Sequence, residues 1–298
     1  MRAVLIILVI GLLTGNFYSQ DVDSNTVVFS SPGGIYQDTI QLDLSTLGEK
    51  IYYTTNGEKP SSNSKRYSTT INIDKTTPIR AVAYKKGRPG KIVTQTYLIG
   101  REYNMAVISI TGNPDDFFSF ERGIYVKGCC ADSVTPYKRA NFWKGWERRI
   151  NIEFYEPTGE LGFNQQVGVR IFGGFSKGLP MKSLAIISRK KYEHKTIKYP
   201  IFPNKEIKKY KSIVLRNSGS DFNNTQFRDA LLTNLIEPLD VDIQAYRPSV
   251  VFINGVYWGI HNVREKINEY YLKSNAGVNP DSVDIMKHRN DLLSGKRD

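Results

Sequence analysis

The sequence predicts a β-rich protein with two folded parts, a small antiparallel β-sandwich followed by an α+β domain. The 298 residues have room for about two domains of ~100–200 residues each. Aromatic residues make up 12% of the chain and include 18 tyrosines, and flat rings fill half-buried sheet surfaces well. Hydrophobic residues at 40% and charged residues at 23% are ordinary for folded proteins and exclude wholesale disorder.

Residues 1–19 have the layout of a secretory signal peptide. Arg2 supplies a positive start, residues 3–13 are apolar apart from Gly11, and residues 15–19 are small, polar or aromatic. The apolar run fits the ~7–15 residues of a signal peptide and is shorter than the roughly 20 of a membrane-spanning helix. We therefore expect a secreted or cell-surface protein with no membrane span after cleavage near Ser19.

Residues 25–100 alternate short strand-like runs with turn residues. Asn56-Gly57 is a turn dipeptide that accepts positive φ. Ile79, Ala81 and Ala83 alternate with other residues, as they do in a strand with one buried face. Strands are expected at 27–29, 40–44, 50–54, 70–73, 78–85 and 92–98. This spacing is typical of a small antiparallel sandwich.

Three segments of this module also carry a family resemblance. They are Phe29-Ser-Ser-Pro-Gly-Gly-Ile-Tyr36, Ile51-Tyr-Tyr-Thr-Thr-Asn-Gly-Glu-Lys-Pro60 and Ile79-Arg-Ala-Val-Ala83. Together they resemble the chitobiase/β-hexosaminidase C-terminal domain family. The resemblance implies an immunoglobulin-like accessory module without catalytic residues. Polysaccharide contact through Tyr52, Tyr53 and Tyr67 is one reading of its aromatic residues, and core packing is the other.

The second part, residues 103–298, contains a β-meander with a glycine-rich connection. Strands are expected at 106–110, 123–126, 150–155, 166–172 and 183–188. The loop 173–180 offers Gly173, Gly174 and Lys177, and Lys182 follows at the next strand. Glycines let backbone N–H groups approach a phosphate, and a lysine neutralises its charge. The same residues also suit an ordinary hairpin, and the Gly-Lys-Ser/Thr ending of a P-loop is absent.

Four blocks in this second part resemble the CotH (spore coat protein H) kinase family. They are Trp146-Glu-Arg-Arg-Ile-Asn-Ile-Glu-Phe-Tyr-Glu-Pro157; Gly168-Val-Arg-Ile-Phe-Gly-Gly-Phe-Ser-Lys177 with Pro180-Met-Lys-Ser183; Val214-Leu-Arg-Asn-Ser-Gly-Ser-Asp221 with Arg228-Asp229; and Arg247-Pro248 through Asn254-Gly-Val-Tyr-Trp-Gly-Ile-His-Asn-Val-Arg-Glu-Lys266. The family comprises atypical protein kinases. The resemblance implies ATP and Mg²⁺ as cofactors and phosphorylation of Ser or Thr on a cell-surface protein.

The resemblance also assigns parts of a kinase N-lobe. Lys182 is the candidate phosphate-binding lysine, with Gly173, Gly174 and Lys177 beside the nucleotide. Helical spacing of apolar residues predicts a helix over 224–237, which Asn223 or Asn224 can cap; the apolar residues are Phe227, Leu231, Leu235 and Ile236. In a kinase this helix would offer an acid to the lysine, and Asp229 or Glu237 serves either as that partner or as an exposed helix-face charge.

A hairpin of residues 250–253 and 258–263 is expected to supply the adenine-holding hinge. It leads to Arg264 and Glu265, expected ion-pair residues, and to a helix over 266–274.

The catalytic lobe of such a kinase is not recognisable. The family's catalytic Asp and metal-binding acids follow the hinge, but residues 281–298 are polar and show no motif around Asp284, Asp291 or Asp298. We therefore expect a truncated kinase-like domain, mainly the N-lobe, without catalytic residues and inactive as this chain. Its missing cover is expected to expose apolar surface near Trp258 and Tyr270.

Positive charge is concentrated in one stretch of the chain. The net charge is +12, and residues 176–216 hold twelve Lys/Arg against Glu193 and Glu206, which gives +10. Such a stretch attracts acidic or phosphate-bearing partners, or else forms a solvated surface. No nucleic-acid-binding motif accompanies it, so nucleic acid is not an expected partner.

The two cysteines, Cys129 and Cys130, are adjacent. Because the peptide between neighbouring cysteines must distort for them to pair, we expect a structural or intermolecular role rather than a bond between them. The three histidines, His194, His261 and His288, are scattered, so a zinc site is not expected.

Two other functions compete with the kinase reading. One is a non-catalytic cell-surface or carbohydrate-binding scaffold. The other is a carbohydrate-active accessory protein, which needs a pair of facing carboxylates. Glu153 and Glu156 lie on one expected strand but, being three residues apart, point to opposite faces.

Overall fold

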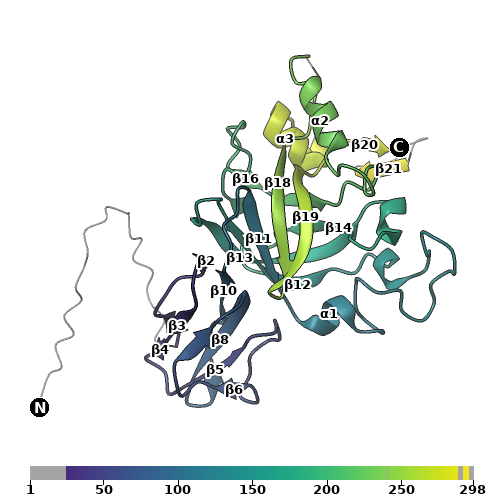
Figure 1. The fold of residues 1–298 in the computed structure, drawn as a ribbon. Coiled ribbons are helices and arrows are strands. Elements are labelled where there is room, and N and C mark those ends of the chain that lie inside the picture. The colour runs from purple at the N-terminus through teal and green to yellow at the C-terminus, as the bar shows by residue number, and fades with distance from the viewer. Residues whose placement is uncertain (1–24, 240, 288–290, 295–298) are drawn as a thin grey trace, which may run out of the picture.

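The computed structural model describes residues 25–239, 241–287 and 291–294. They form two β-rich modules that lie against each other, with α2 and α3 at the end of the second module far from the first (Figure 1). The predicted order, a small β-sandwich followed by an α+β region, is confirmed. The predicted signal peptide, residues 1–19, lies outside the described residues. None of the described helices is long and apolar enough to cross a membrane.

The first module is a sandwich of short sheets. Its larger sheet has the order β2-β10-β8-β5-β6, with β9 paired to β8, and the pairs β1–β4 and β3–β7 complete it. Leu42, Ile79 and Tyr97 are fully buried in its core. The strands are β1 (Val27–Phe29), β2 (Gly34–Tyr36), β3 (Ile40–Leu42), β4 (Leu44–Thr46), β5 (Lys50–Thr54), β6 (Lys65–Arg66), β7 (Ile71–Ile73), β8 (Thr77–Lys85), β9 (Arg88–Pro89) and β10 (Val93–Ile99).

The second module is a closed barrel with the strand order β11-β12-β13-β14-β17-β19-β18. Parallel pairing of β11 with β18 closes it, so the barrel has no open edge. The strands are β11 (Ala106–Thr111), β12 (Arg148–Tyr155), β13 (Leu161–Phe172), β14 (Ser183–Ile187), β17 (Ser212–Arg216), β18 (Tyr246–Ile253) and β19 (Val256–Glu265).

Alternation along the barrel strands decides which side chains reach the outer face. On β13, Val169 and Ile171 belong to the barrel core, so Arg170 and Phe172 point outward. On β12, Ile152 and Phe154 are core residues in the same way.

Short elements complete the second module. They are α1 (Pro114–Phe118), α2 (Arg228–Leu235), α3 (Glu269–Ala276), the ribbons β15 (Ile197–Lys198) with β16 (Lys209–Tyr210) and β20 (Ile285–Lys287) with β21 (Asp291–Ser294), and 3-10 turns at Asn141–Trp143, Phe175–Gly178 and Pro280–Ser282. The strand expected at 123–126 does not form, and Ile124 and Tyr125 are instead buried within a turn.

The helix expected over 224–237 is shorter and lies differently. The periodic residues Leu231 and Leu235 are exposed, and Ala230 is the buried one. Neither Asn223 nor Asn224 caps the helix; instead Asp221 Oδ2 accepts a hydrogen bond from the Arg228 backbone N–H at 3.2 Å. The apolar stripe of α2 therefore faces outward instead of packing on the barrel.

Trp258, where exposed apolar surface was expected, is partly covered. Its indole donates a hydrogen bond to the Tyr125 hydroxyl at 2.8 Å, and the two rings pack edge to face. Tyr270, by contrast, is 38% exposed, as expected.

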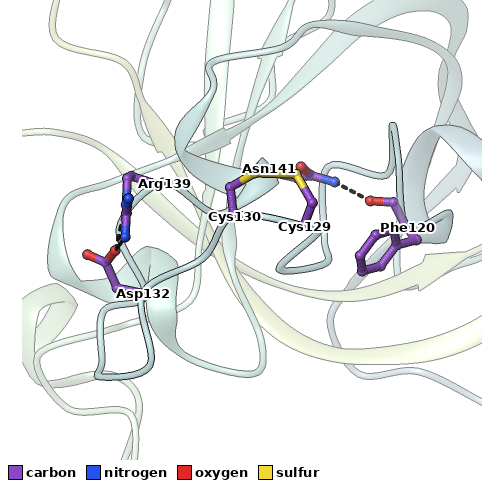
Figure 2. Close-up of a disulfide and its surroundings, with 6 residues drawn as sticks. All are labelled: Phe120, Cys129, Cys130, Asp132, Arg139 and Asn141. Carbon is purple, nitrogen blue, oxygen red and sulfur yellow. Dashed lines mark hydrogen bonds and ion pairs between the residues drawn. A yellow bond between two sulfur atoms is a disulfide. The ribbon is translucent and has the colours of Figure 1, made fainter.

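The two adjacent cysteines are joined by a disulfide, contrary to the prediction (Figure 2). They lie in the long connection between α1 and β12. The ion pair of Arg139 with Asp132 and the hydrogen bond from the Asn141 amide to the Phe120 carbonyl flank the disulfide. The expectation used only the adjacent positions of the two cysteines. In the structure these two contacts hold the connection on either side of the disulfide.

A buried joint connects the two modules. Leu98 of the first module packs with Val107, Tyr155, Val250 and Phe252 of the barrel in one apolar cluster. This cluster covers the outer face of β11, β12 and β18, and it continues into a polar network.

The polar part of the joint is centred on Glu153, which is 1% exposed. Its carboxyl accepts hydrogen bonds from the Thr96 backbone N–H at 2.9 Å, the Thr96 hydroxyl at 2.5 Å and the Tyr155 hydroxyl at 2.7 Å. The Thr96 hydroxyl also meets that of Ser109 at 2.7 Å. Burial raises the pKa of Glu153 to about 7.

The turn between β18 and β19 also packs against the first module. A Cβ added to Gly57 would lie 2.2 Å from Asn254 Oδ1, and one added to Gly255 would lie 2.8 Å from Pro78 Cδ. Backbones therefore approach so closely here that only glycine fits.

A candidate phosphate-binding cleft

A cleft lies on the outer face of the barrel beside the glycine-rich loop. It consists of a hollow of about 660 Å³ and an adjoining one of about 750 Å³. The two hollows share the wall residues Arg170, Phe172 and Arg216. They therefore form one continuous depression along β13 and β17.

The strand registers explain the floor of the cleft. Arg170 lies opposite Ala185, which lies opposite Val214, which lies opposite Arg264. This row places two small apolar residues between two arginines. Phe172 lies opposite Ser183 in the neighbouring row, towards the glycine-rich loop.

The cleft holds more positive than negative charge. Asp229 on α2 forms ion pairs with Arg216 at 2.5 Å and with Arg264 at 3.5 Å. One carboxylate thus serves two guanidinium groups, and Arg170, Lys266 and the acidic Glu269 line the same cleft. Burial and the nearby Arg170 lower the pKa of Lys266.

Arg264 is only partly satisfied. It is 5% exposed and donates one hydrogen bond from Nη2 to Thr233 Oγ1 at 3.2 Å. Among the described residues its Nε and Nη1 have no hydrogen-bond acceptor. A buried donor without an acceptor costs free energy, so this guanidinium fits an anionic ligand.

The wall opposite α2 is built from two loops in close contact. Gly173 has a φ of +110°, which favours glycine. A Cβ added to Gly219 would lie 2.4 Å from Ser176 Cβ. A Cβ added to Gly174 would meet nothing within 4 Å, so this backbone is open to the cleft.

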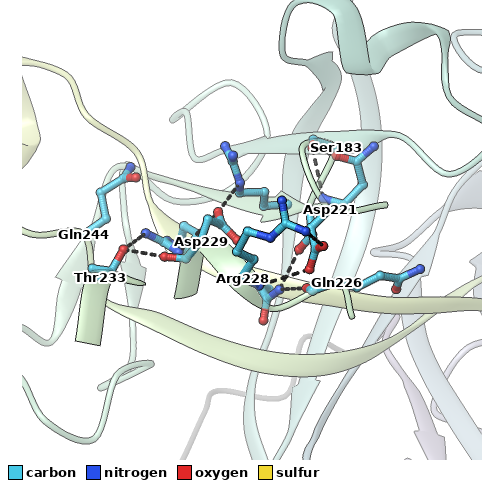
Figure 3. Close-up of polar contacts among 12 residues, drawn as sticks. Ser183, Asp221, Gln226, Arg228, Asp229, Thr233 and Gln244 are labelled. Atoms are coloured by element: carbon cyan, nitrogen blue, oxygen red, sulfur yellow. Dashed lines mark hydrogen bonds and ion pairs between the residues drawn. The ribbon is translucent and has the colours of Figure 1, made fainter. Parts of the chain in front are cut away.

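A hydrogen-bonded turn after β17 supports the start of α2 (Figure 3). Asp221 accepts from the Thr225 hydroxyl and pairs with Arg228 at 3.0 Å. The Asn262 amide donates to the Ser218 hydroxyl at 2.9 Å and to the Gln226 carbonyl at 3.0 Å. These contacts set the position of the helix that carries Asp229.

Lys182 lies beneath the glycine-rich loop. Its ammonium donates to the carbonyls of Lys177 at 2.7 Å and Leu179 at 2.8 Å and lies 4.1 Å from the centre of the Phe142 ring. Burial, with a smaller contribution from Lys127, lowers its pKa to about 8. The side chain thus holds the loop from behind.

The predicted site residues therefore separate into two groups. Gly173, Gly174 and Lys177 line the cleft as the loop reading requires. Lys182 is not among the lining residues, because Ser183 faces the cleft and neighbouring strand residues point to opposite sides.

Arg170 and Arg216 were missed by the sequence reasoning. Alternation could have identified them. Arg170 precedes the core residue Ile171 and Arg216 follows the core residue Leu215, so each arginine occupies an outward position on its strand. Asp229 was expected either to pair with Lys182 or to be exposed. It is instead half-buried and paired with two arginines.

The structure also places the other residues predicted for this region. Arg264 and Glu265 form ion pairs as expected, Glu265 with Lys205 at 2.7 Å. The expected hinge hairpin contacts the first module at its turn, and only its end, with Arg264 and Lys266, lines the cleft.

Carboxylates for a metal ion are not gathered in the described part of the chain. No group of three or more His, Cys, Asp or Glu side chains there is placed to hold one. The donor set of the cleft, guanidinium and ammonium groups with open glycine backbone, fits the phosphates of a nucleotide.

Two family models match the chain. The model of the CotH kinase protein matches residues 169–298, and that of the chitobiase/beta-hexosaminidase C-terminal domain matches residues 31–95. The two-part resemblance is thereby confirmed, and domains of these two kinds suggest an extracellular protein. The first match begins on β13 and covers every cleft residue from Arg170 onward. Comparison with curated proteins gave no match.

Proposed function

We propose, from the premise that residues 169–298 form a CotH kinase domain, that this exported chain binds ATP in the cleft. The observation that carries the proposal is the excess of guanidinium groups around a small apolar floor, beside a glycine-rich loop. Transfer of phosphate to Ser or Thr of a surface protein is the activity that the family implies. The leader-like residues 1–19 support export.

The described residues assign parts of the ligand to parts of the cleft. Arg170 and Arg216 would hold phosphate oxygens, since guanidinium groups bind them with paired hydrogen bonds. Open backbone at Gly174 permits close approach of a phosphate. Phe172 and Val214, which both line the cleft, offer apolar surface to a flat base.

Asp229 and Lys182 have positioning roles in this proposal. Asp229 aligns Arg216 and Arg264, and Lys182 fixes the loop through two of its carbonyls. Mg²⁺, when bound with ATP, would neutralise part of the charge on the phosphates. Phosphoryl transfer also needs an acid that accepts the substrate proton, and the proposal assigns no described residue to that step.

Isothermal titration with ATP, with and without Mg²⁺, tests the proposal. Replacing Arg170 and Arg216 with alanine should weaken ATP binding by at least about 100-fold, because each hydrogen bond to a charged group contributes about 1.5–3 kcal/mol. The matched control is Arg66→Ala with Arg88→Ala, which removes two exposed arginines of the first module.

A folded wild-type protein that binds no ATP at millimolar concentration would contradict the proposal and favour the non-catalytic scaffold. Equal losses in the cleft variant and the control would also contradict it, because the effect would then follow net charge rather than the cleft.

A further inference from the structure

The twelve basic residues between 176 and 216 do not form one patch. Six have assigned contacts: Lys182 under the loop, Lys177 and Arg216 in the cleft, Lys205 with Glu265, and Arg189 and Lys191 with Glu147. The other six form what we call the lysine ribbon, on β15, β16 and the adjoining loops. They are Lys190, Lys195, Lys198, Lys208, Lys209 and Lys211.

The lysine ribbon has no acidic partner among the described residues. Of the two acids in this stretch, Glu193 is paired with Lys91 at 2.7 Å, and Glu206 forms no ion pair with the ribbon. The Lys211 ammonium lies 3.4 Å from the Lys195 carbonyl and 5.7 Å from the centre of the Tyr270 ring.

Two of these lysines repel each other by construction. Lys198 on β15 lies directly opposite Lys209 on β16, and both are exposed. Like charges directly opposite in an antiparallel pair destabilise it. The other pair of this ribbon, Ile197 opposite Tyr210, is buried in the core of the barrel module and holds the two strands together. The repulsion between the two exposed lysines therefore persists at the surface, and an external anion would relieve it.

The lysine ribbon extends to the cleft. Lys209, Lys211 and Lys266 line one small hollow beside α3, and Lys266 also lines the cleft. An anion lying along β15 and β16 therefore reaches the rim of the proposed nucleotide site.

We propose that the lysine ribbon docks an acidic polypeptide segment of the protein that this domain phosphorylates, an inference that rests on the proposed function. Residues 188–211 expose no large hydrophobic side chain that could insert into a lipid surface. The hydroxyls of Tyr192 and Tyr199 are held by Glu147 and Glu156, so these rings are committed within the fold rather than offered for stacking on bases.

Lysines without arginines also favour this partner. A lysine ammonium is a compact charge on a flexible stem and does not impose paired geometry. Such a surface recognises the density of charge on a flexible chain, as in a run of Glu and Asp.

Fluorescence anisotropy of a labelled octa-glutamate peptide, with an octa-glutamine peptide as reference, tests the docking. The wild type should bind the acidic peptide alone, and binding should weaken as salt screens the charges. Changing Lys195, Lys198 and Lys209 to glutamate should weaken binding by at least about tenfold. The matched control changes the exposed Lys50, Lys59 and Lys75 of the first module to glutamate, so its net charge equals that of the lysine-ribbon variant.

The single change Lys209→Glu guards against a folding artefact. It replaces a repelling pair with an attracting one, so peptide affinity should fall while the melting temperature stays equal or rises. Equal loss in the first-module control, or no binding of octa-glutamate by the wild type, would overturn the proposal. Binding of anionic vesicles or a single-stranded oligonucleotide in place of the peptide would also overturn it.

A loss of peptide docking can be distinguished from a loss of ATP binding. The lysine-ribbon variant should keep wild-type ATP affinity, and the variant lacking Arg170 and Arg216 should keep peptide binding. Loss of both ligands by either variant would contradict two independent sites.

Discussion

The joint and the cleft are two polar regions on the outer face of one barrel, and they treat charge in opposite ways. At the joint a single carboxyl, Glu153, receives three hydrogen bonds and is shut away from water. In the cleft Arg170 faces an open hollow, and Asp229 is shared between Arg216 and Arg264. At the joint the donors of Thr96 and Tyr155 find an acceptor in Glu153, whereas in the cleft donors of Arg264 have no acceptor among the described residues.

The difference separates structural from binding roles. A buried polar group whose partners are all present contributes to one defined arrangement. A group of like charges held together without enough counter-charge lowers stability and is retained where a ligand supplies the missing charge. Perturbed pKa values occur in both regions, so the number of satisfied partners distinguishes the two roles better than the shift does.

The largest effect expected is from breaking the joint. Glu153→Ala would leave the Thr96 N–H, the Thr96 hydroxyl and the Tyr155 hydroxyl without their acceptor. Buried donors left unpaired cost about 1–3 kcal/mol each, so we expect a loss of about 3–5 kcal/mol in the free energy of unfolding. Urea unfolding measures it. A loss below about 1 kcal/mol would show that water enters the joint and replaces the carboxyl.

A pH series on Glu153→Gln sharpens the comparison. The folded-state pKa of about 7 lies above the usual value of 4.5, so the folded state binds more protons between these values. The contribution of Glu153 is fully present below pH 4.5 and is lost as pH rises through 7. The glutamine variant should lack this slope and be more stable than wild type at pH 8, by up to roughly 3 kcal/mol.

The difference between the unfolding free energies of wild type and Glu153→Gln, measured from pH 4 to 8, isolates this group. Glu58→Gln, at an exposed position of the first module, is the control. A flat difference curve would mean that the pKa of Glu153 is the same in the folded and unfolded states.

The smallest effect is expected from the cleft. The Arg170 side chain makes no hydrogen bond or ion pair with another described residue, and its backbone pairing with Ala185 does not depend on the side chain. Arg170→Ala should therefore change the free energy of unfolding by less than about 0.5 kcal/mol. The same variant should lose ATP affinity under the proposed function. If Arg170→Ala lowered the free energy of unfolding as much as Glu153→Ala, Arg170 would have a structural role. The contrast between a binding cleft and a structural joint would then no longer hold.

Local pattern was sufficient to predict much of the fold. Alternation and turn residues placed most of the longer strands, and the turn at Asn254-Gly255 lies between the two strands of the expected hairpin. Strand β2 and the barrel strand β17 were not expected. Helix α2 was predicted too long because Leu231 and Leu235 repeat at helical spacing. That apolar stripe faces outward in the structure, so periodicity identified the helix but not its buried face.

The site was harder to predict because it depends on register between distant strands. Arg170, Arg216 and Arg264 come from β13, β17 and β19, and only the barrel pairing brings them together. Lys182 was chosen from its position after the loop. Its side of the strand could not be read without knowing that Ser183 faces the cleft.

Glu153 shows the same limit at the joint. Its placement on a strand, on the face opposite to Glu156, was predictable from spacing. That this face would meet Thr96 of another module was not, because the contact joins residues 57 positions apart. Glu156 instead pairs with Arg247 and accepts from the Tyr199 hydroxyl.

The close contact of the Asn254-Gly255 turn with Gly57 and Pro78 also fixes the orientation of the barrel relative to the first module. Because the two modules meet through this turn and the buried joint, immobilising the first module on any surface sets the angle at which the cleft faces that surface. Proteins anchored nearby would then meet the cleft at an effective concentration set by geometry rather than by diffusion from solution.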